Sequence, residues 1–126
     1  MKSLQLRPGS VIQVDFGFRL PPGHEQAGLR PVVVIAIPSE IEEPRFPLII
    51  IVPLTSFKNQ QWALTSTTIY HRVYAGEGGI KLDSLALLDQ IQVLDINRVH
   101  KLVGELGTNS FSVIKQKIGK LLKIPD

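Results

Sequence analysis

The polar stretch LPPGHEQAG, residues 20–28, concentrates side chains that could transfer protons. His24, Glu25 and Gln26 stand at its centre, and Arg30 follows at the entrance of the apolar run PVVVIAI. A histidine titrates near neutral pH, a carboxylate can act as acid or base, and an arginine stabilises negative charge. Because a rigid strand would hold Arg30 in place, this stretch is a candidate active site. A surface loop with scattered polar residues is the alternative interpretation.

A second polar pair closes another apolar run. Thr55 and Ser56 follow LIIIVPL, residues 48–54. If the two apolar runs pair as a hairpin with aligned ends, Thr55 lies near Arg30 and both can serve one site. The alternative is an ordinary strand end, at which the two hydroxyls turn the backbone.

Asp89 and Gln90 interrupt a third apolar run, SLALLDQIQV, residues 84–93. A polar group buried without a partner costs about 2–7 kcal/mol, so we expect this pair either to face a polar cleft or to have a hydrogen-bonding or ionic partner. His24, Glu25 and Asp89 do not have the spacing of a metal site, and the chain has no cysteine. We therefore expect no metal and no cofactor.

The elements that must position these side chains follow from the hydrophobic pattern. Continuous β-branched runs are typical of buried strands, and apolar residues at helical spacing indicate an amphipathic helix. We expect strands over residues 11–18, 31–37, 48–54, 64–74 and 84–93, a strand or short helix over 98–106, and a C-terminal helix capped by Thr108, Asn109 or Ser110 that buries Phe111, Ile114, Ile118, Leu121 and Leu122. The pattern predicts a small, bent or barrel-like antiparallel sheet covered by one helix.

Composition limits the class of protein. The 126 residues suit a single domain over residues 1–126, and 44% hydrophobic residues exclude disorder as the main description. Without a cysteine, a leader-like segment or an apolar run of about 18 residues, we expect a cytoplasmic protein with no membrane span. The net charge of +3 arises near the C-terminus, where we expect Lys115, Lys117, Lys120 and Lys123 to form a solvated helix face. A nucleic-acid patch is the alternative for these lysines.

Four segments in order carry a family resemblance: GSVIQVDFG, PPGHEQAGLRPVVVI, IIIVPLTS and GGIKLDSLALLDQIQVLDINRV. They are spread over residues 9–99, and together they resemble the PemK/MazF family of toxin endoribonucleases. The resemblance implies an SH3-like small barrel of the PemK/CcdB type and a homodimer. It also implies metal-independent cleavage of single-stranded mRNA at a short sequence, and neutralisation by a cognate antitoxin.

The resemblance also implies roles for particular residues. The arginine of the family's RP pair falls on Arg30, and the hydroxyl that closes the next strand falls on Thr55, with Ser56 beside it. The resemblance assigns RNA contact or proton handling to the polar loop His24, Glu25 and Gln26 and to the pair Asp89 and Gln90. Two positions depart from the pattern, since Leu87 and Gln92 stand where some members have arginine. These departures exclude an arginine acid at position 87 and predict a less basic RNA groove.

The chemistry of RNA cleavage fits these residue types. The 2′-hydroxyl of RNA is the nucleophile, so the protein need only orient the phosphate, move protons and stabilise charge. We assign charge stabilisation to Arg30, a phosphate hydrogen bond to Thr55, and proton transfer to His24, with Glu25 or Asp89 as further carriers. The expected products are a 2′,3′-cyclic phosphate and a 5′-hydroxyl.

Two other functions compete with this interpretation. The first is a non-enzymatic toxin that binds a protein target, as gyrase-poisoning relatives on the same fold do. Those relatives end in a Trp-Gly-Ile signature, whereas this chain ends KLLKIPD and its only tryptophan is Trp62. The second is a family member that binds RNA or an antitoxin without cutting; Leu87 and Gln92 favour it, and Arg30 and Thr55 argue against it.

Overall fold

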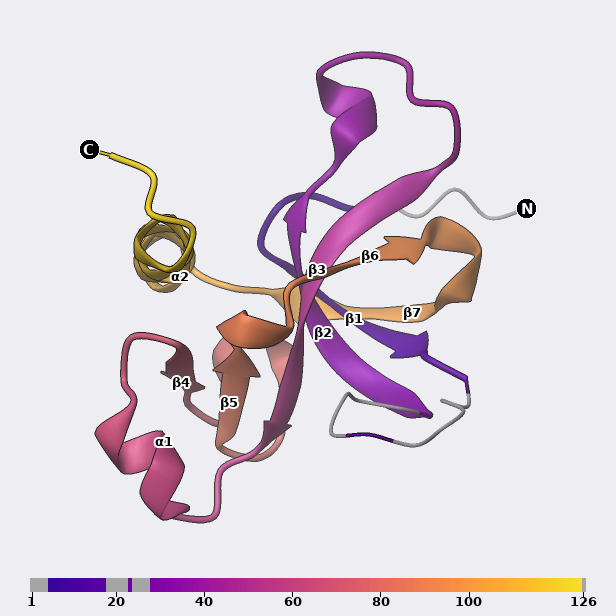
Figure 1. The fold of residues 1–126 in the computed structure, drawn as a ribbon. Coiled ribbons are helices and arrows are strands. Elements are labelled where there is room, and N and C mark those ends of the chain that lie inside the picture. The colour runs from indigo at the N-terminus through magenta and orange to yellow at the C-terminus, as the bar shows by residue number, and fades with distance from the viewer. Residues whose placement is uncertain (1–4, 18–22, 24–27, 126) are drawn as a thin grey trace.

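The computed structural model describes residues 5–17, 23 and 28–125. In that part of the chain, seven strands and two α-helices follow one another in this order: β1 (Ser10–Asp15), β2 (Leu29–Ala36), β3 (Leu48–Ser56), α1 (Gln61–Thr65), β4 (Tyr70–Val73), β5 (Ser84–Leu87), β6 (Gln92–Asp95), β7 (Val99–Glu105) and α2 (Thr108–Leu121). Figure 1 shows β3 running through the middle of the molecule. The predicted architecture, an antiparallel sheet with a C-terminal helix, is confirmed.

The strand order is β4-β5-β3-β2-β1-β7, and the described strands pair antiparallel throughout. Strand β6 lies off this path and pairs with the first half of β3, whereas β5 pairs with its last three residues. The sheet is bent but open, because β4 and β7 stand at the two ends of the order. The predicted hairpin of the two apolar runs is confirmed as the antiparallel pair β2 and β3.

The core explains why the central strands are apolar without alternation. Neighbouring residues of β1, β2 and β3 pack into two clusters on opposite faces of the sheet. Val33, for example, belongs to one cluster and Val32 to the other. Helix α2 covers the first cluster with the buried side chains of Phe111, Ile114 and Ile118. Because both faces of the sheet are covered at residues 32–34 of β2 and 49–54 of β3, these stretches are hydrophobic without alternation.

Both ends of α2 differ from the prediction. The N-cap residue is Gly107, and no side chain caps the helix, so the predicted hydroxyl and amide caps lie within its first turn. At the other end, Leu122 is exposed, because the helix ends at Leu121 and the chain turns away at Lys123, where φ is +56°. Leu121 does pack against the core, as its spacing predicted.

Two predicted strands are wrong in extent. The run 64–74 forms a strand only over β4, because Leu64 and Thr65 complete α1, where the Thr65 hydroxyl donates to the carbonyl oxygen of Gln61 at 3.2 Å. The run 84–93 is divided by the 3-10 turn Leu88–Gln90. This turn is needed because β5 and β6 pair with different halves of β3.

Two further boundaries are settled by the structure. The segment 98–106, left open between strand and helix, forms strand β7. The first strand ends at Asp15 rather than continuing to position 18, because the Asp15 carboxylate accepts a hydrogen bond from the Gly17 amide at 2.8 Å in a turn. Position 18 itself lies outside the described residues.

Glycines allow the 3-10 turn Glu77–Gly79 to lie directly against β7. A β-carbon on Gly104 would overlap the Gly78 carbonyl, with the carbonyl carbon only 2.6 Å away. A β-carbon on Gly79 would lie 2.6 Å from the carbonyl oxygen of Val103, and both Gly78 and Gly79 have positive φ. Only residues without a β-carbon fit this contact. The turn leads directly into Ile80 and Lys81, so the contact fixes the start of that segment.

Candidate active-site pocket

Arg30, Thr55 and Ser56 line one pocket, whose volume is about 320 Å³. Strand β2 begins at Leu29 and strand β3 ends at Ser56, so the pocket lies where the two strand ends meet. In the antiparallel β2–β3 register, Val32 pairs with Pro53. Arg30, two residues before Val32, therefore lies opposite Thr55, two residues after Pro53. The structure therefore brings together the arginine and the hydroxyl that the sequence placed at two separate strand ends.

Two lysines, Lys81 and Lys101, line the same pocket and were not among the predicted site residues. Lys101 lies opposite Gln13 on β1, and Gln13 lies opposite Pro31 on β2, so the sheet carries Lys101 to the side of Arg30. None of the residues that line the pocket in the described part of the chain is acidic. Three cationic and three hydroxyl side chains, the latter from Thr55, Ser56 and Ser84, thus line one hollow, which favours an anionic ligand. Whether the groove is less basic than in other family members stays a prediction.

The predicted loop residues His24, Glu25 and Gln26 lie outside the described residues. Backbone hydrogen bonds join the described residues on either side of this segment. The Gly28 amide donates to the Gly17 carbonyl at 3.0 Å, and the Phe16 amide donates to the Gly28 carbonyl at 2.8 Å. These bonds lie next to Arg30 at the same end of the β1–β2 pair. The roles assigned to the three loop residues stay predictions.

Asp89 is an exposed residue of the turn Leu88–Gln90, so the expectation that this carboxylate sits inside an apolar strand is wrong. It accepts a hydrogen bond from the Tyr70 hydroxyl at 3.1 Å. Burial raises the pKa of Tyr70, and the hydrogen bond to Asp89 raises it further. Neither Asp89 nor Gln90 lines the pocket of Arg30 and Thr55. Their predicted contact with RNA therefore concerns a separate place on the surface.

The two departures from the family pattern have different surroundings. Leu87 is buried in a small cluster with Ala63 and Leu85 beneath α1, so this position serves packing. Gln92 is half-buried, and its side-chain amide donates to the carbonyl oxygen of Gln90 at 3.1 Å. Neither side chain lines the pocket.

Lys117 departs from the predicted solvated face of the C-terminal helix. Its Nζ lies 3.1 Å from Nδ1 of the half-buried His71 on β4. Burial lowers the pKa of His71, and the positive charge of Lys117 lowers it further. Burial also lowers the pKa of Lys117. A neutral His71 that accepts a hydrogen bond from Lys117 accounts for this pair, which joins α2 to β4 away from the pocket.

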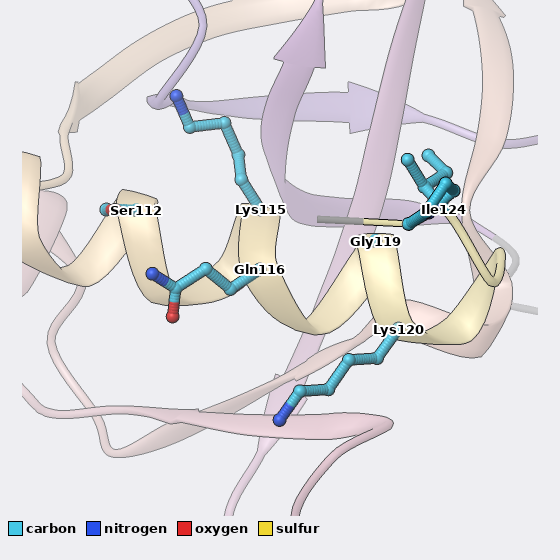
Figure 2. Close-up of a pocket in the computed structure, with 7 residues that line it drawn as sticks. Ser112, Lys115, Gln116, Gly119, Lys120 and Ile124 are labelled. Atoms are coloured by element: carbon cyan, nitrogen blue, oxygen red, sulfur yellow. The ribbon is translucent and has the colours of Figure 1, made fainter.

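Two other hollows are larger but less suited to a phosphate. The first, about 550 Å³, runs along α2, and Figure 2 shows Lys115 and Lys120 extending in different directions rather than toward a common point. The second, about 540 Å³, lies between α2 and the β2–β3 connection and carries Glu40, Glu42 and Glu43. Acidic side chains repel a phosphate, so the pocket of Arg30 and Thr55 is the better candidate.

Within the described part of the chain, no group of three histidine, cysteine or acidic side chains lies close enough together to hold a metal ion. Among the same residues, neither helix has the length and apolar character needed to cross a membrane.

A bent antiparallel sheet with a C-terminal helix and a basic pocket at two strand ends defines a small β protein suited to an anionic ligand. PemK-like, MazF-like toxins of type II toxin–antitoxin systems form the family that matches residues 7–122, and the chain belongs to this family. The family resemblance inferred from the four sequence segments is thereby confirmed.

Solved structures agree with this assignment. MazF from Deinococcus radiodurans is similar to the chain with a TM-score of 0.73 and 21% identity, over 97% of this chain and 100% of that one. A MazE–MazF complex from the same organism gives 0.71 and 21%, over 98% and 100%. An endoribonuclease in complex with its cognate antitoxin, from a Mycobacterial species, gives 0.67 and 14%, over 94% and 95%. At these identities the likeness establishes the fold. Comparison with curated proteins gave no match.

Proposed function

We propose that this toxin is an endoribonuclease that cleaves single-stranded mRNA in the pocket of Arg30 and Thr55. The observation that carries the proposal is the meeting of Arg30, Thr55, Lys81 and Lys101 in one hollow. Cations and hydroxyl donors of this kind bind phosphate groups. Similar structures that bear the name endoribonuclease, from Mycobacterial species, support the same activity.

The reaction uses groups that RNA itself supplies. The 2′-oxygen attacks the adjacent phosphorus and loses its proton, the bond from phosphorus to the 5′-oxygen breaks, and that oxygen receives a proton. The products are a 2′,3′-cyclic phosphate and a 5′-hydroxyl. The charge that builds on the phosphate oxygens is stabilised by Arg30, whose planar donors suit two oxygens at once, and by a hydrogen bond from Thr55. The lysines hold the neighbouring phosphates.

Proton transfer falls to the loop that precedes β2. We propose His24 as a proton carrier, because histidine titrates near neutral pH, with Glu25 as its partner. Gln26 and Ser56 would bind the RNA close to the cut. Asp89 and Gln90 would contact RNA farther along the surface. No cofactor takes part, and a homodimer presents two such pockets.

The proposal predicts cleavage of a long single-stranded RNA by the purified protein in excess EDTA. Discrete cuts should appear, because the nucleophile belongs to the RNA and the chain's own side chains supply the rest. Mapping of the product ends should find cyclic phosphates upstream and 5′-hydroxyls downstream. RNA that stays intact across many sequence contexts would refute the proposal. It would favour instead a toxin that acts by binding a protein such as gyrase, or a member that binds RNA without cutting.

We further propose that a cognate antitoxin blocks this pocket with an acidic segment that is disordered when free. Structures that contain MazE with MazF, and an endoribonuclease with its antitoxin, support such a partner, and the cations of the pocket suit an acidic chain. The protein encoded beside this one should therefore bind it and stop RNA cleavage. Binding measured with Lys81→Gln and Lys101→Gln variants should be weaker, and unchanged binding would place the antitoxin elsewhere.

A further inference from the structure

A cluster of two aromatic rings and an arginine lies next to the pocket. The guanidinium carbon of Arg72 on β4 is 4.2 Å from the ring centre of Phe57 and 4.6 Å from that of Tyr74. Asp83 holds the same guanidinium through an ion pair of 2.9 Å. Tyr74 is 55% exposed although it is a large aromatic side chain. We name Phe57, Arg72 and Tyr74 the stacking row.

The stacking row is continuous with the pocket along two stretches of chain. Phe57 directly follows Ser56, and Asp83 directly follows Leu82; Ser56 and Leu82 both line the pocket. The Phe57 amide donates to the Asp83 carbonyl at 2.9 Å, which joins the two stretches. Leu82, which lines the pocket and is exposed, thus directly precedes the residue that holds Arg72.

The strand register places the row on the same face of the sheet as Thr55. Thr55 on β3 pairs with Leu85 on β5, and Leu85 pairs with Arg72 on β4. Paired residues of antiparallel strands point to the same face, and neighbouring strands are about 4.8 Å apart. Arg72 thus stands two strands, roughly 10 Å, from Thr55. An extended RNA strand that has one phosphate at Thr55 reaches the row with the next one or two nucleotides.

The charge of Arg72 is already balanced within the protein. The Ala75 amide donates to the Asp83 carboxylate at 2.8 Å, and this bond, together with the Arg72 guanidinium, lowers the pKa of Asp83. Asp83 therefore stays ionised and fixes the plane of the guanidinium. A paired, fixed guanidinium is better suited to stack on a flat ring than to bind a phosphate. Exposed ion pairs of this kind add little stability, so stability alone does not account for the exposed Tyr74 ring beside this one. Phe57 is half-buried and packs against the cluster of Ala63, Leu85 and Leu87.

We propose that the stacking row binds bases of the RNA strand that flank the phosphate held at Arg30 and Thr55. The inference rests on the proposed RNA cleavage and names the surface that holds the substrate beyond the cut. Aromatic rings and guanidinium planes stack on any base, so the row contributes affinity with little preference for sequence. The sequence specificity of the cut comes from other contacts.

A binding experiment separates stacking from phosphate attraction. The probe is a fluorescent oligoadenylate of ten 2′-O-methyl nucleotides, which lacks the nucleophile and stays intact; a second probe has the same backbone without bases. Loss of one stacked base costs about 5- to 140-fold in affinity. We expect Tyr74→Ala to weaken binding of the first probe by that factor and to leave binding of the second probe unchanged. Tyr74→Trp should retain binding of the oligoadenylate.

Phe46 provides a matched control. Its ring is 54% exposed and lies 4.9 Å from the guanidinium carbon of Arg45, so it resembles the row in chemistry. It precedes β3, whereas Thr55 is near the end of that strand, and seven strand residues span about 23 Å. Figure 1 shows the β2–β3 connection and the end of β3 on opposite sides of the molecule. Phe46→Ala should bind both probes as the unchanged protein does.

The outcomes distinguish this inference from the proposed function. If the unchanged protein cleaves RNA in EDTA while Tyr74→Ala binds the oligoadenylate normally, the stacking row is refuted and the endoribonuclease stands. Equal weakening by Phe46→Ala would also refute it, since any exposed ring would then act alike. If the unchanged protein neither cleaves RNA nor binds the oligoadenylate, the proposed function fails and this inference fails with it.

Discussion

Replacing Arg30 with alanine is expected to lower the rate of RNA cleavage by about 10²-fold or more, because removal of one donor that stabilises transition-state charge has effects of this size. Arg30 lines the pocket opposite Thr55, so Thr55→Ala should cause a loss of similar size. Arg30→Lys keeps the charge but lacks the planar pair of donors and should recover only part of the rate. Initial rates on one RNA substrate in EDTA measure all three effects.

The fold should be unchanged in these variants, since Arg30 is exposed and Thr55 only half-buried. Circular dichroism and thermal unfolding check this. Arg45→Ala is the matched control, because Arg45 precedes β3 at the opposite end from the pocket. Full activity of either Arg30→Ala or Thr55→Ala would refute the roles assigned to these two residues. An equal loss in Arg45→Ala would show that general positive charge, rather than the pocket, governs the rate.

Gly104→Ala is expected to destabilise the fold by about 3 kcal/mol, at the upper end of the usual cost of overpacking. The added β-carbon would overlap the backbone of Gly78, which cannot rotate away as a flexible side chain could. For a domain of this size, about 3 kcal/mol corresponds to a fall in Tm of roughly 10 °C or more. Thermal unfolding followed by circular dichroism measures it. Cleavage should fall as well, because the same contact fixes the start of the segment that carries Lys81.

Gly119→Ala provides the opposite control. Gly119 lies within α2, and a β-carbon there meets nothing within 4 Å. Alanine favours the helix over glycine by about 0.5–1 kcal/mol, so Tm should rise slightly. A Tm of Gly104→Ala equal to that of the unchanged protein would contradict the tight contact between the turn and β7.

The two central strands and their meeting point could be predicted because their residues carry a strong local signal. The runs at 31–37 and 48–54 are apolar and β-branched throughout, and both faces of β2 and β3 are indeed buried. Antiparallel pairing then places the first residues of one strand beside the last residues of the other. Arg30 and Thr55 could for this reason be brought together from the sequence alone.

The lysines of the pocket could not be predicted, because they depend on long-range pairing. Lys101 lies on β7, a segment whose sequence was compatible with either a strand or a helix. The face on which its side chain lies could therefore not be predicted. Lys81 is held in place by a backbone contact between two glycine-containing segments, which no local pattern reports. The helix α1 was missed for a related reason: its sequence QWALT is short, and packing of Ala63 on Leu85 and Leu87 stabilises it.

The turn Leu88–Gln90 constrains the length of the chain as strictly as the core constrains its composition. It connects β5, which pairs with the end of β3, to β6, which pairs with the start of β3. In β6, Leu94 is 5% exposed and Val93 is 55% exposed, so adjacent residues have opposite environments. Deleting one residue between β5 and β6 would turn the side chains of β6 to the opposite face of the sheet, so that Val93 would be buried and Leu94 exposed. Among related sequences, insertions and deletions are therefore expected in the β2–β3 connection and not in the turn between β5 and β6.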